Sequence, residues 1–289
     1  MPELLKDLAV LAPAKINLHL AVKEKRSDGF HNIESVFLAL DWGDSLFFEC
    51  KAPETENDEL IMLRAEQTGE PLSIPDNIIL RALALFREKT GFFKKFKITV
   101  EKRIPVGGGL GGGSSDAAAS LLALNRMAGL PLGKDALLEA GNILGSDIPF
   151  FLHEIPAAWV TGRGENIEPL EMPLLAAEFP AQMFLVLVNP GFSSNTAEAY
   201  RLLDEHRAKE KCFNNSPLYN DFLPVFDERE KSIYNKICFS LRGLGALFAS
   251  LSGAGSTCFG VFQNREQAQK AAEELRGEWS FVHCCNSKI

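Results

Sequence analysis

The residues best suited to chemistry form a dense glycine run in the segment IPVGGGLGGGSSDAAA, which spans residues 104–119. Six of the seven residues from 107 to 113 are glycine. Glycine loses much conformational entropy on folding, so a dense run indicates that the backbone must approach another group closely. Residue types that cap helices and a helical pattern follow directly, and a helix N-terminus offers N–H groups that suit a phosphate. The segment therefore predicts an anion-binding loop, with a flexible linker as the alternative.

The glycine run lacks the lysine of the pattern G-x-x-x-x-G-K-[ST], and a match to G-x-G-x-x-G is trivial in so glycine-rich a run. A cation for a bound phosphate must then come from elsewhere. Lys15, in the segment APAKINL, is one candidate. Strand alternation places Lys15, Asn17 and His19 on one face. On spacing alone, a solvated sheet face is the favoured interpretation of these three residues.

A lone carboxylate, Asp147, opens the apolar segment GSDIPFF. A carboxylate in such a place could orient a hydroxyl group and accept its proton. The pattern is equally typical of an aspartate that caps a helix or a turn. Both interpretations of Asp147 stay open at this point.

Two turns carry further functional groups. The segment SGAGST, residues 252–257, is either an ordinary hairpin turn or a second set of N–H groups near an anion. The turn Asp28–Gly29–Phe30–His31 presents an aromatic ring and an imidazole. It is either a hairpin tip with a packed phenylalanine or a stacking platform with a hydrogen-bonding edge, which would suit a nucleobase.

The bulk properties disfavour several classes of protein. The 289 residues allow one large domain or two ordinary ones, and the net charge of −8 argues against a nucleic-acid binder. The six cysteines show neither metal-ligand spacing nor a disulfide framework, which favours buried thiols in a cytoplasmic protein. The N-terminal segment is not typical of a secretory signal, and no apolar stretch has the length of a membrane span. We expect neither nucleic-acid nor membrane partners.

Hydrophobic periodicity and turn signals predict a mixed α+β chain. Short strands and loops are expected over 52–75, and a turn over 41–44. Helices are predicted over 77–90, 114–128, 133–144, 196–207, 227–241 and 265–276. Strands are predicted within 8–20 on either side of Pro13, and over 33–40, 45–50, 96–102, 157–161, 183–188, 248–251, 257–262 and 280–284.

Taken in order, three motifs resemble those of the GHMP kinase superfamily: APAKINL near the start, PVGGGLGGGSSDAA in the middle and SGAGST near the end. The early D-G-x-H turn, the long glycine form of the loop and the G-x-D-I-P-F-F segment resemble the branch that acts on 4-diphosphocytidyl-2-C-methyl-D-erythritol. The resemblance implies a two-domain α+β fold. Its N-terminal ATP-binding domain, residues 1–165, would be similar to ribosomal protein S5 domain 2, and its C-terminal domain, residues 166–289, would be a ferredoxin-like α/β layer.

The resemblance also implies an activity, namely ATP-dependent phosphorylation of the 2-hydroxyl group of that alcohol in the non-mevalonate route to isoprenoid and terpenoid precursors. Asp147 would be the catalytic base, and Lys15 would stabilise Asp147 and the transferring phosphoryl group. Mg²⁺ would bridge phosphate oxygens, with Ser115 as an indirect contact and no dedicated metal ligands. The residues implied to wrap the ATP phosphates are Pro105, Val106, Gly107, Gly108, Gly109, Leu110, Gly111, Gly112, Gly113, Ser114 and Ser115.

The small-molecule partner implied by the resemblance is a cytidine diphosphate-linked methylerythritol. His31 would read the edge of the cytosine, with Phe30 and Tyr200 stacked on its two faces. Phe30 stands where the family usually has tyrosine, so stacking is kept and a phenolic hydrogen bond is lost. The implied substrate residues are Asn17, Phe30, His31, Tyr200, Ser252, Gly253, Gly255 and Thr257. A homoserine or mevalonate-type kinase and an inactive GHMP-fold binding protein are the alternatives, and either a monomer or a homodimer is compatible with the sequence.

Overall fold

The computed structural model describes residues 6–51, 57–64, 76–170, 179–180, 182–209 and 218–288. The chain groups into two compact units that are discontinuous in sequence. Unit 1 combines residues 1–14, 42–104 and 111–154, and unit 2 combines 15–41, 105–110 and 155–289. The long strands β1 (Asp7–Lys25) and β2 (His31–Cys50) contribute a segment to each unit. This partition differs from a division at residue 165, which stays a prediction about family domains.

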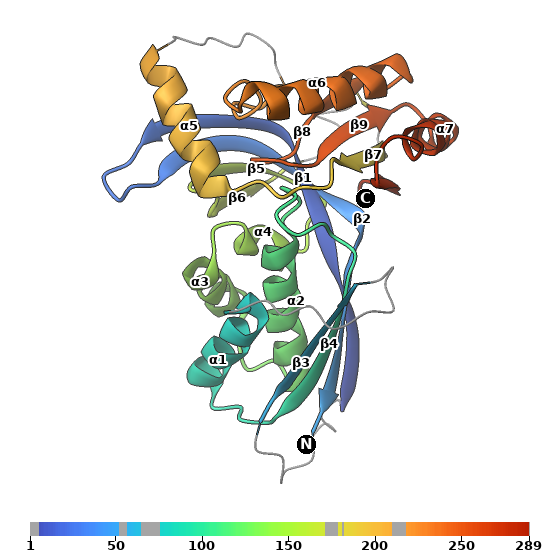
Figure 1. Ribbon diagram of the computed structural model, residues 1–289. Coiled ribbons are helices and arrows are strands. Elements are labelled where there is room, and N and C mark those ends of the chain that lie inside the picture. The colour runs from blue at the N-terminus through green and yellow to red at the C-terminus, as the bar shows by residue number, and fades with distance from the viewer. Residues whose placement is uncertain are drawn as a thin grey trace. The chain divides into compact units, whose positions relative to one another are not determined.

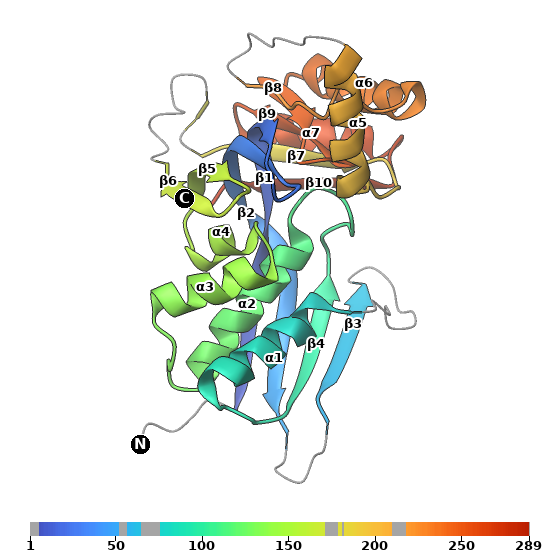
Figure 2. The same cartoon turned by 90° about the vertical axis from the view of Figure 1, so that its left-hand side faces the viewer.

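Unit 1 is a helical layer beside a sheet. Strand β4 (Phe96–Lys102) pairs antiparallel with the second half of β2 and parallel with β3 (Glu59–Arg64). Every second residue of β4 is buried, as its alternating apolar pattern requires. Figures 1 and 2 show the helices on one side of these strands. These helices are α1 (Ile78–Thr90), α2 (Gly112–Met127), α3 (Lys134–Leu144) and the short α4 (Ile148–Leu152).

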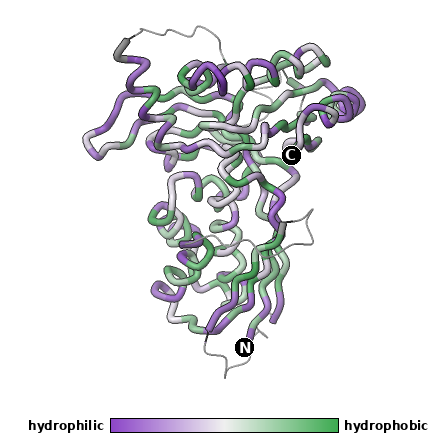
Figure 3. The backbone as a smooth tube through the Cα atoms, in the orientation of Figure 1, coloured by the Kyte–Doolittle hydropathy of each residue, from purple (hydrophilic) through white to green (hydrophobic). Residues whose placement is uncertain are grey.

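Unit 2 contains an antiparallel sheet in the order β10-β7-β9-β8, formed by β7 (Phe184–Asn189), β8 (Phe248–Leu251), β9 (Cys258–Phe262) and β10 (Phe281–Asn286). Helix α6 (Glu228–Gly243) packs on β8 and β9, and α7 (Arg265–Leu275) packs on β7 and β10. Helix α7 is mostly hydrophilic in Figure 3, and it buries a narrow stripe of three alanines and one leucine. The result is the small α+β layer that the sequence predicts for this region.

Unit 2 also holds the first half of β2. This half of β2 pairs with β5 (Ala157–Gly162), and β5 pairs with β6 (Asn166–Pro169). Helix α5 (Thr196–Lys209) belongs to this unit as well.

Three predicted elements agree closely with the structure. Strand β4 has the predicted bounds, α3 begins one residue later than predicted, and α1 begins after its Asn77 cap and ends at Gly91 in the left-handed conformation.

The predicted turn over 41–44 is wrong, because β2 continues through it. Gly43 is a contact residue and not a turn residue: a Cβ at this position would lie 2.0 Å from the carbonyl oxygen of Ala12 on β1. The predicted break at Pro13 is also wrong, since Pro13 lies within the continuous strand β1. Strand β1 pairs with β2 off the main strand order of the sheet, an edge position where a missing N–H is tolerated. Most of the predicted 52–75 segment lies outside the described residues.

Candidate active site

The structure brings together the first half of the glycine run, residues 107–110, and the 252–257 turn, which are far apart in the sequence and both in unit 2. The backbone N–H of Thr257 donates to the carbonyl of Gly108 at 3.1 Å, and the Ser252 hydroxyl donates to the carbonyl of Gly109 at 2.9 Å. Gly109 has φ +76, and a Cβ there would lie 2.1 Å from the Ser252 carbonyl oxygen. The glycines of the loop therefore serve close packing against the 252–257 turn as well as access for a ligand.

Two asparagines that the sequence analysis did not assign to the site hold the 252–257 turn. The Asn189 side-chain amide donates to the hydroxyls of Ser256 and Thr257, both at 3.0 Å. The Asn220 amide donates to the carbonyls of Leu251 and Gly253, both at 2.8 Å. Asn189 stands in an Asn-Pro-Gly sequence that indicated only a strand end, and no sequence signal distinguished Asn220.

Other predicted ATP-binding residues differ in how they are presented. Val106 is exposed, whereas the side chain of Leu110 is buried and its carbonyl accepts the backbone N–H of Lys15 at 3.0 Å. The carbonyl of Pro105 accepts the backbone N–H of Gly108 at 3.2 Å, which forms a tight turn at the start of the loop. Gly107 packs on Ser193, since a Cβ added at residue 107 would lie 2.7 Å from the Cβ of Ser193. In the loop segment of unit 2, Val106 is thus the exposed apolar side chain and Leu110 the anchor.

Helix α2 begins in the glycine run itself, at Gly112, with Gly111 as its N-cap residue. The prediction that a side chain at 114–116 caps this helix is wrong, because the helix begins at Gly112 and residues 114–116 lie inside it. Gly113 and Ser114 lie in the first turn, and N–H groups at this end of a helix lack intrahelical partners. The start of α2 can therefore bind an anion through its backbone.

A buried charge cluster in unit 1, Asp44–Lys102–Asp116, adjoins the start of α2. Lys102 Nζ lies 2.5 Å from Asp44 Oδ2 and 2.6 Å from Asp116 Oδ2. Asp44 Oδ1 accepts the backbone N–H groups of Arg103 and Ile104, the two residues that lead into the glycine loop. Sequence reasoning missed this cluster, because nothing in the local pattern marks three residues from β2, β4 and α2 as neighbours.

The cluster contains one cation and two carboxyl groups, so it is neutral when one carboxyl group carries a proton. Asp44 uses both oxygens for hydrogen bonds, whereas Asp116 Oδ1 is buried with no partner among the described residues. Burial raises the pKa of Asp116 to about 7, although Lys102 acts against this shift. Burial acts to lower the pKa of Lys102, but Asp116 and Asp44 raise it above its ordinary value. Burial thus favours the protonated form of Asp116 in the folded protein.

Lys15, Asn17 and His19 are all buried, as are the apolar residues that alternate with them, so the interpretation of a solvated face is wrong. Lys15 Nζ donates to Asn17 Oδ1 at 2.6 Å and lies 4.4 Å from the centroid of the Phe37 ring. Asn17 Nδ2 donates to the Ser35 hydroxyl at 2.9 Å. These contacts in unit 2 hold a buried lysine in one orientation.

Asp147 lies in unit 1, half-buried, at the residue that precedes α4. Asp147 lies in a turn at the N-cap position of α4, but its side chain makes no cap hydrogen bond to this helix. The five residues of α4 are all buried, and they anchor Asp147 at the edge of an apolar layer. The structure thus gives Asp147 a defined backbone position in its unit.

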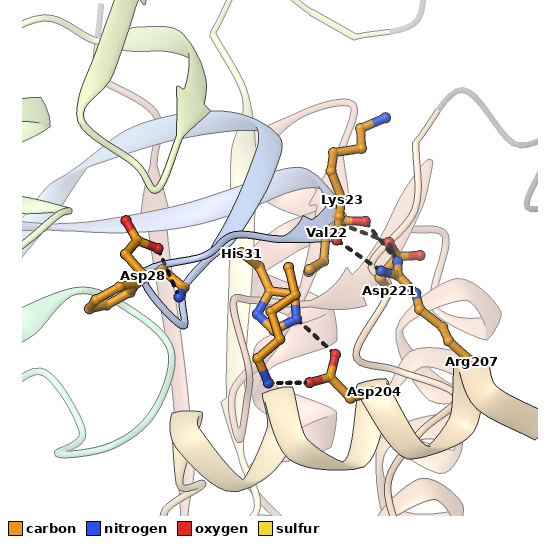
Figure 4. Close-up of polar contacts among 9 residues, drawn as sticks. Val22, Lys23, Asp28, His31, Asp204, Arg207 and Asp221 are labelled. Atoms are coloured by element: carbon orange, nitrogen blue, oxygen red, sulfur yellow. Dashed lines mark hydrogen bonds and ion pairs between the residues drawn. The ribbon is translucent and has the colours of Figure 1, made fainter.

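The turn after β1 places the predicted base-binding residues in unit 2. Phe30 is 56% exposed, with the Arg163 guanidinium 5.2 Å from its ring centroid. The ring of His31 is buried and stacks on Tyr200 of α5, with centroids 5.0 Å apart and an interplanar angle of 17°. His31 Nε2 also lies 2.8 Å from Asp204 Oδ1, a partner that sequence reasoning missed (Figure 4).

No described helix has the length and hydropathy needed to cross a membrane. No group of three or more His, Cys, Asp or Glu side chains within the described ranges is arranged to hold a metal ion.

Two family models match the sequence. The model of the GHMP kinases N-terminal domain matches residues 77–154, which include the glycine loop and Asp147. The model of the GHMP kinases C-terminal domain matches residues 203–280, which include the 252–257 turn. Both matches agree with the family resemblance seen in the motifs.

Full-length relatives are similar over nearly the whole chain. The 4-diphosphocytidyl-2-C-methyl-D-erythritol kinase of Thermodesulfovibrio yellowstonii is 37% identical over 95% of this chain and 96% of its own length. The kinase of the same name from Syntrophotalea carbinolica is 37% identical over 93% of this chain and 95% of its own length.

Solved structures give the same result for the fold. A crystal structure of 4-(cytidine 5′-diphospho)-2C-methyl-D-erythritol kinase has 29% identity and a TM-score of 0.76, with 98% of this chain and 100% of that chain covered. Homoserine kinase from Cytophaga hutchinsonii, at 16% identity and a TM-score of 0.68 with 100% and 96% covered, shares the fold alone. The chain has the two-domain GHMP kinase fold, and it belongs to the GHMP kinases and, among them, to the family of 4-diphosphocytidyl-2-C-methyl-D-erythritol kinases.

Proposed function

We propose that this chain transfers the γ-phosphoryl group of ATP to the 2-hydroxyl group of 4-diphosphocytidyl-2-C-methyl-D-erythritol, a step that supplies isoprenoid precursors. The observation that carries the proposal is 37% identity over 95% of the chain to a kinase named for this compound. The two glycine motifs, the buried Lys15 and the aromatic turn at Phe30 are features that such a kinase would use.

The glycine loop and the first turn of α2 bind the phosphates of ATP in this proposal. The glycine N-cap leaves the N–H groups of the first turn to an anion, and the contact of Gly108 with Thr257 holds the loop in shape. The net charge of −8 disfavours long-range attraction of a nucleotide, so binding depends on these local groups.

A magnesium ion bound with ATP would neutralise phosphate charge. The Ser115 hydroxyl fits a contact with the ion or its water shell, because Oγ is buried and has no hydrogen-bond partner within the described residues. Magnesium commonly keeps several waters and uses substrate phosphates as ligands, which suits a chain whose described part holds no cluster of acidic or imidazole ligands.

Lys15 and Asp147 are the proposed catalytic residues. Phosphoryl transfer depends mainly on positioning and on electrostatic stabilisation of the spreading negative charge. A buried lysine held by Asn17 is suited to that stabilisation. We assign Asp147 to accept the proton of the acceptor hydroxyl, because a carboxylate held at a fixed backbone position beside the buried helix α4 can act as a general base.

The proposed substrate groups lie in unit 2. Phe30 offers an exposed ring for stacking, and the buried His31 offers a hydrogen-bonding edge. Asn17 and the 252–257 turn supply further polar groups that we assign to the substrate and its phosphates. The ring of Tyr200 lies on His31, and we assign to it a contact with the face of the cytosine opposite Phe30.

An assay of ADP release with a panel of acceptor alcohols tests the function. We expect turnover with 4-diphosphocytidyl-2-C-methyl-D-erythritol and none with homoserine or mevalonate. The Asp147→Asn variant is the matched control for ATP hydrolysis by a contaminant. Turnover with homoserine or mevalonate, without turnover of the cytidine compound, would contradict the proposal.

A further inference from the structure

We propose that Asp204 is a positioning residue that fixes the ring proton of His31, so that His31 selects a cytosine base over a uracil base. The inference rests on the proposed function, and it concerns the base-binding part of the same substrate site. It assigns a specificity role to Asp204, a residue of α5 that the sequence motifs did not mark.

Asp204 connects two cationic or ionisable side chains from the hairpin that links β1 and β2. His31 Nε2 lies 2.8 Å from Asp204 Oδ1, and Lys25 Nζ donates to Asp204 Oδ2 at 2.8 Å. The side chain of His31 is 5% exposed and that of Asp204 is 34% exposed. Figure 4 shows Asp204 on its helix pointing toward the imidazole ring. Each oxygen of the carboxylate thus has its own partner.

The charge state of Asp204 decides which ring nitrogen carries the proton. Burial acts to raise the pKa of Asp204, but the hydrogen bonds from Lys25 and His31 lower it below its ordinary value. The ionised carboxylate can only accept, so His31 Nε2 must donate. A neutral imidazole has one N–H group, which makes Nδ1 an acceptor.

The helix that carries Asp204 is held in register with the hairpin. Arg207, one turn further along α5, donates to the carbonyl of Val22 at 2.7 Å and to Asp221 Oδ2 at 2.8 Å. The same Asp221 oxygen accepts the N–H of Val22 at 2.8 Å (Figure 4). Tyr200, one turn before Asp204, stacks on the imidazole face. These contacts fix both the ring plane and the nitrogen that meets the carboxylate.

An acceptor at His31 Nδ1 can distinguish cytosine from uracil at the exocyclic group in which the two bases differ. Cytosine presents an amino group there, which donates, and uracil presents a carbonyl oxygen, which accepts. An acceptor nitrogen pairs with the amino group and leaves the uracil oxygen opposite another acceptor. Among the described residues the hydrogen bond of the His31 ring is made by Nε2, and we assign the other ring nitrogen, Nδ1, to the base.

The Asp204→Asn variant should exchange the donor and acceptor nitrogens of the His31 ring, because the Lys25 ammonium can only donate. The amide oxygen must face Lys25 Nζ, which turns the amide N–H₂ toward His31 Nε2 and moves the ring proton to Nδ1. The ratio of kcat/KM for the cytidine diphosphate-linked alcohol over its uridine analogue should fall by about 10- to 100-fold, mainly through KM. A merely structural role for Asp204 would lower both activities and leave the ratio unchanged.

A rescue variant tests the orientation argument. In the double variant Lys25→Met/Asp204→Asn, the amide can turn its oxygen to His31 Nε2, so the cytosine preference should recover in part. Glu205→Gln is the matched control, since Glu205 is the next residue of α5, is exposed and pairs with Arg201. This control should keep the wild-type ratio.

Binding of cytidine 5′-diphosphate and uridine 5′-diphosphate, measured by calorimetry, separates this inference from the proposed function. A wild-type preference for the cytidine compound that Asp204→Asn removes supports the inference, whether or not the methylerythritol compound is phosphorylated. An unchanged preference in a folded Asp204→Asn variant, or a wild type with no preference, overturns it. Failure of the wild type to phosphorylate the cytidine diphosphate-linked alcohol contradicts the proposed function instead.

Discussion

The Asp44–Lys102–Asp116 cluster predicts a stability difference that changes with pH. The perturbation is Asp116→Asn, which keeps the shape of the side chain and removes its titration. The folded state raises the pKa of Asp116 from 3.8 to about 7 because the carboxyl group is buried beside Asp44. A folded protein that binds the proton more tightly than the unfolded chain loses stability as pH rises from the ordinary pKa to the raised one.

The size of the effect follows from the two pKa values. Between pH 5 and pH 8 the wild type should lose about 3 kcal/mol of unfolding free energy relative to Asp116→Asn, at about 1.4 kcal/mol per pKa unit. The loss is greatest between pH 5 and pH 7 and ends above the raised pKa. Because the group is almost fully buried, with Asp116 only 2% exposed, solvent screening does not reduce this figure substantially.

Urea unfolding of both proteins at pH 5, 6, 7 and 8, followed by circular dichroism, measures the difference directly. Titrating groups remote from the cluster are shared by the two proteins and cancel in the comparison. The variant Asp135→Asn, which makes the same change at an exposed carboxylate of α3 in the same unit, is the control. A wild-type minus Asp116→Asn difference that is constant from pH 5 to pH 8 would refute the assignment of the proton to Asp116.

Two further predictions concern catalysis and the loop. Lys15→Ala and Asp147→Asn should each lower kcat by about 100-fold or more while ATP still binds, as measured by single-turnover kinetics and nucleotide titration; near-normal turnover in either variant would remove that residue from its proposed role. Gly109→Ala should cost more than about 1 kcal/mol of unfolding free energy and weaken ATP binding, because its Cβ would meet the Ser252 carbonyl and φ is positive. Gly113→Ala, where the nearest atom to a Cβ is 4.0 Å away, is the control, and equal losses in the two variants would contradict the packing argument.

Local signals were sufficient where an element is specified by its own residues. Helix α1 has an asparagine cap and a C-terminal glycine, and β4 has strict alternation, so both were predicted closely. Local signals were misleading where a residue serves a contact with a distant strand. Gly43 and Asp44 are typical of a turn. Gly43 instead allows β1 to approach closely, because a side chain there would meet the backbone of Ala12. Asp44 binds Lys102 and the backbone N–H groups of residues 103 and 104.

The candidate site divides in the same way. The glycine loop, the 252–257 turn and Lys15 could be singled out because their composition is unusual for ordinary structure. Asp204, Asn189 and Asn220 could not, because each is an ordinary polar residue whose role depends on what the fold places beside it. The solvated-face interpretation of Lys15 failed for the same reason, since burial is a property of tertiary packing.

The identity of the phosphorylated product tests the central claim most directly. Incubation of the wild-type protein with ATP, Mg²⁺ and 4-diphosphocytidyl-2-C-methyl-D-erythritol, followed by ³¹P NMR and mass spectrometry, reports both the mass and the position of the new phosphate. We predict one added phosphoryl group, as a monoester at the 2-hydroxyl, with the cytidine diphosphate link intact. Formation of ADP and inorganic phosphate with an unchanged alcohol, or phosphorylation at another hydroxyl, would contradict the account.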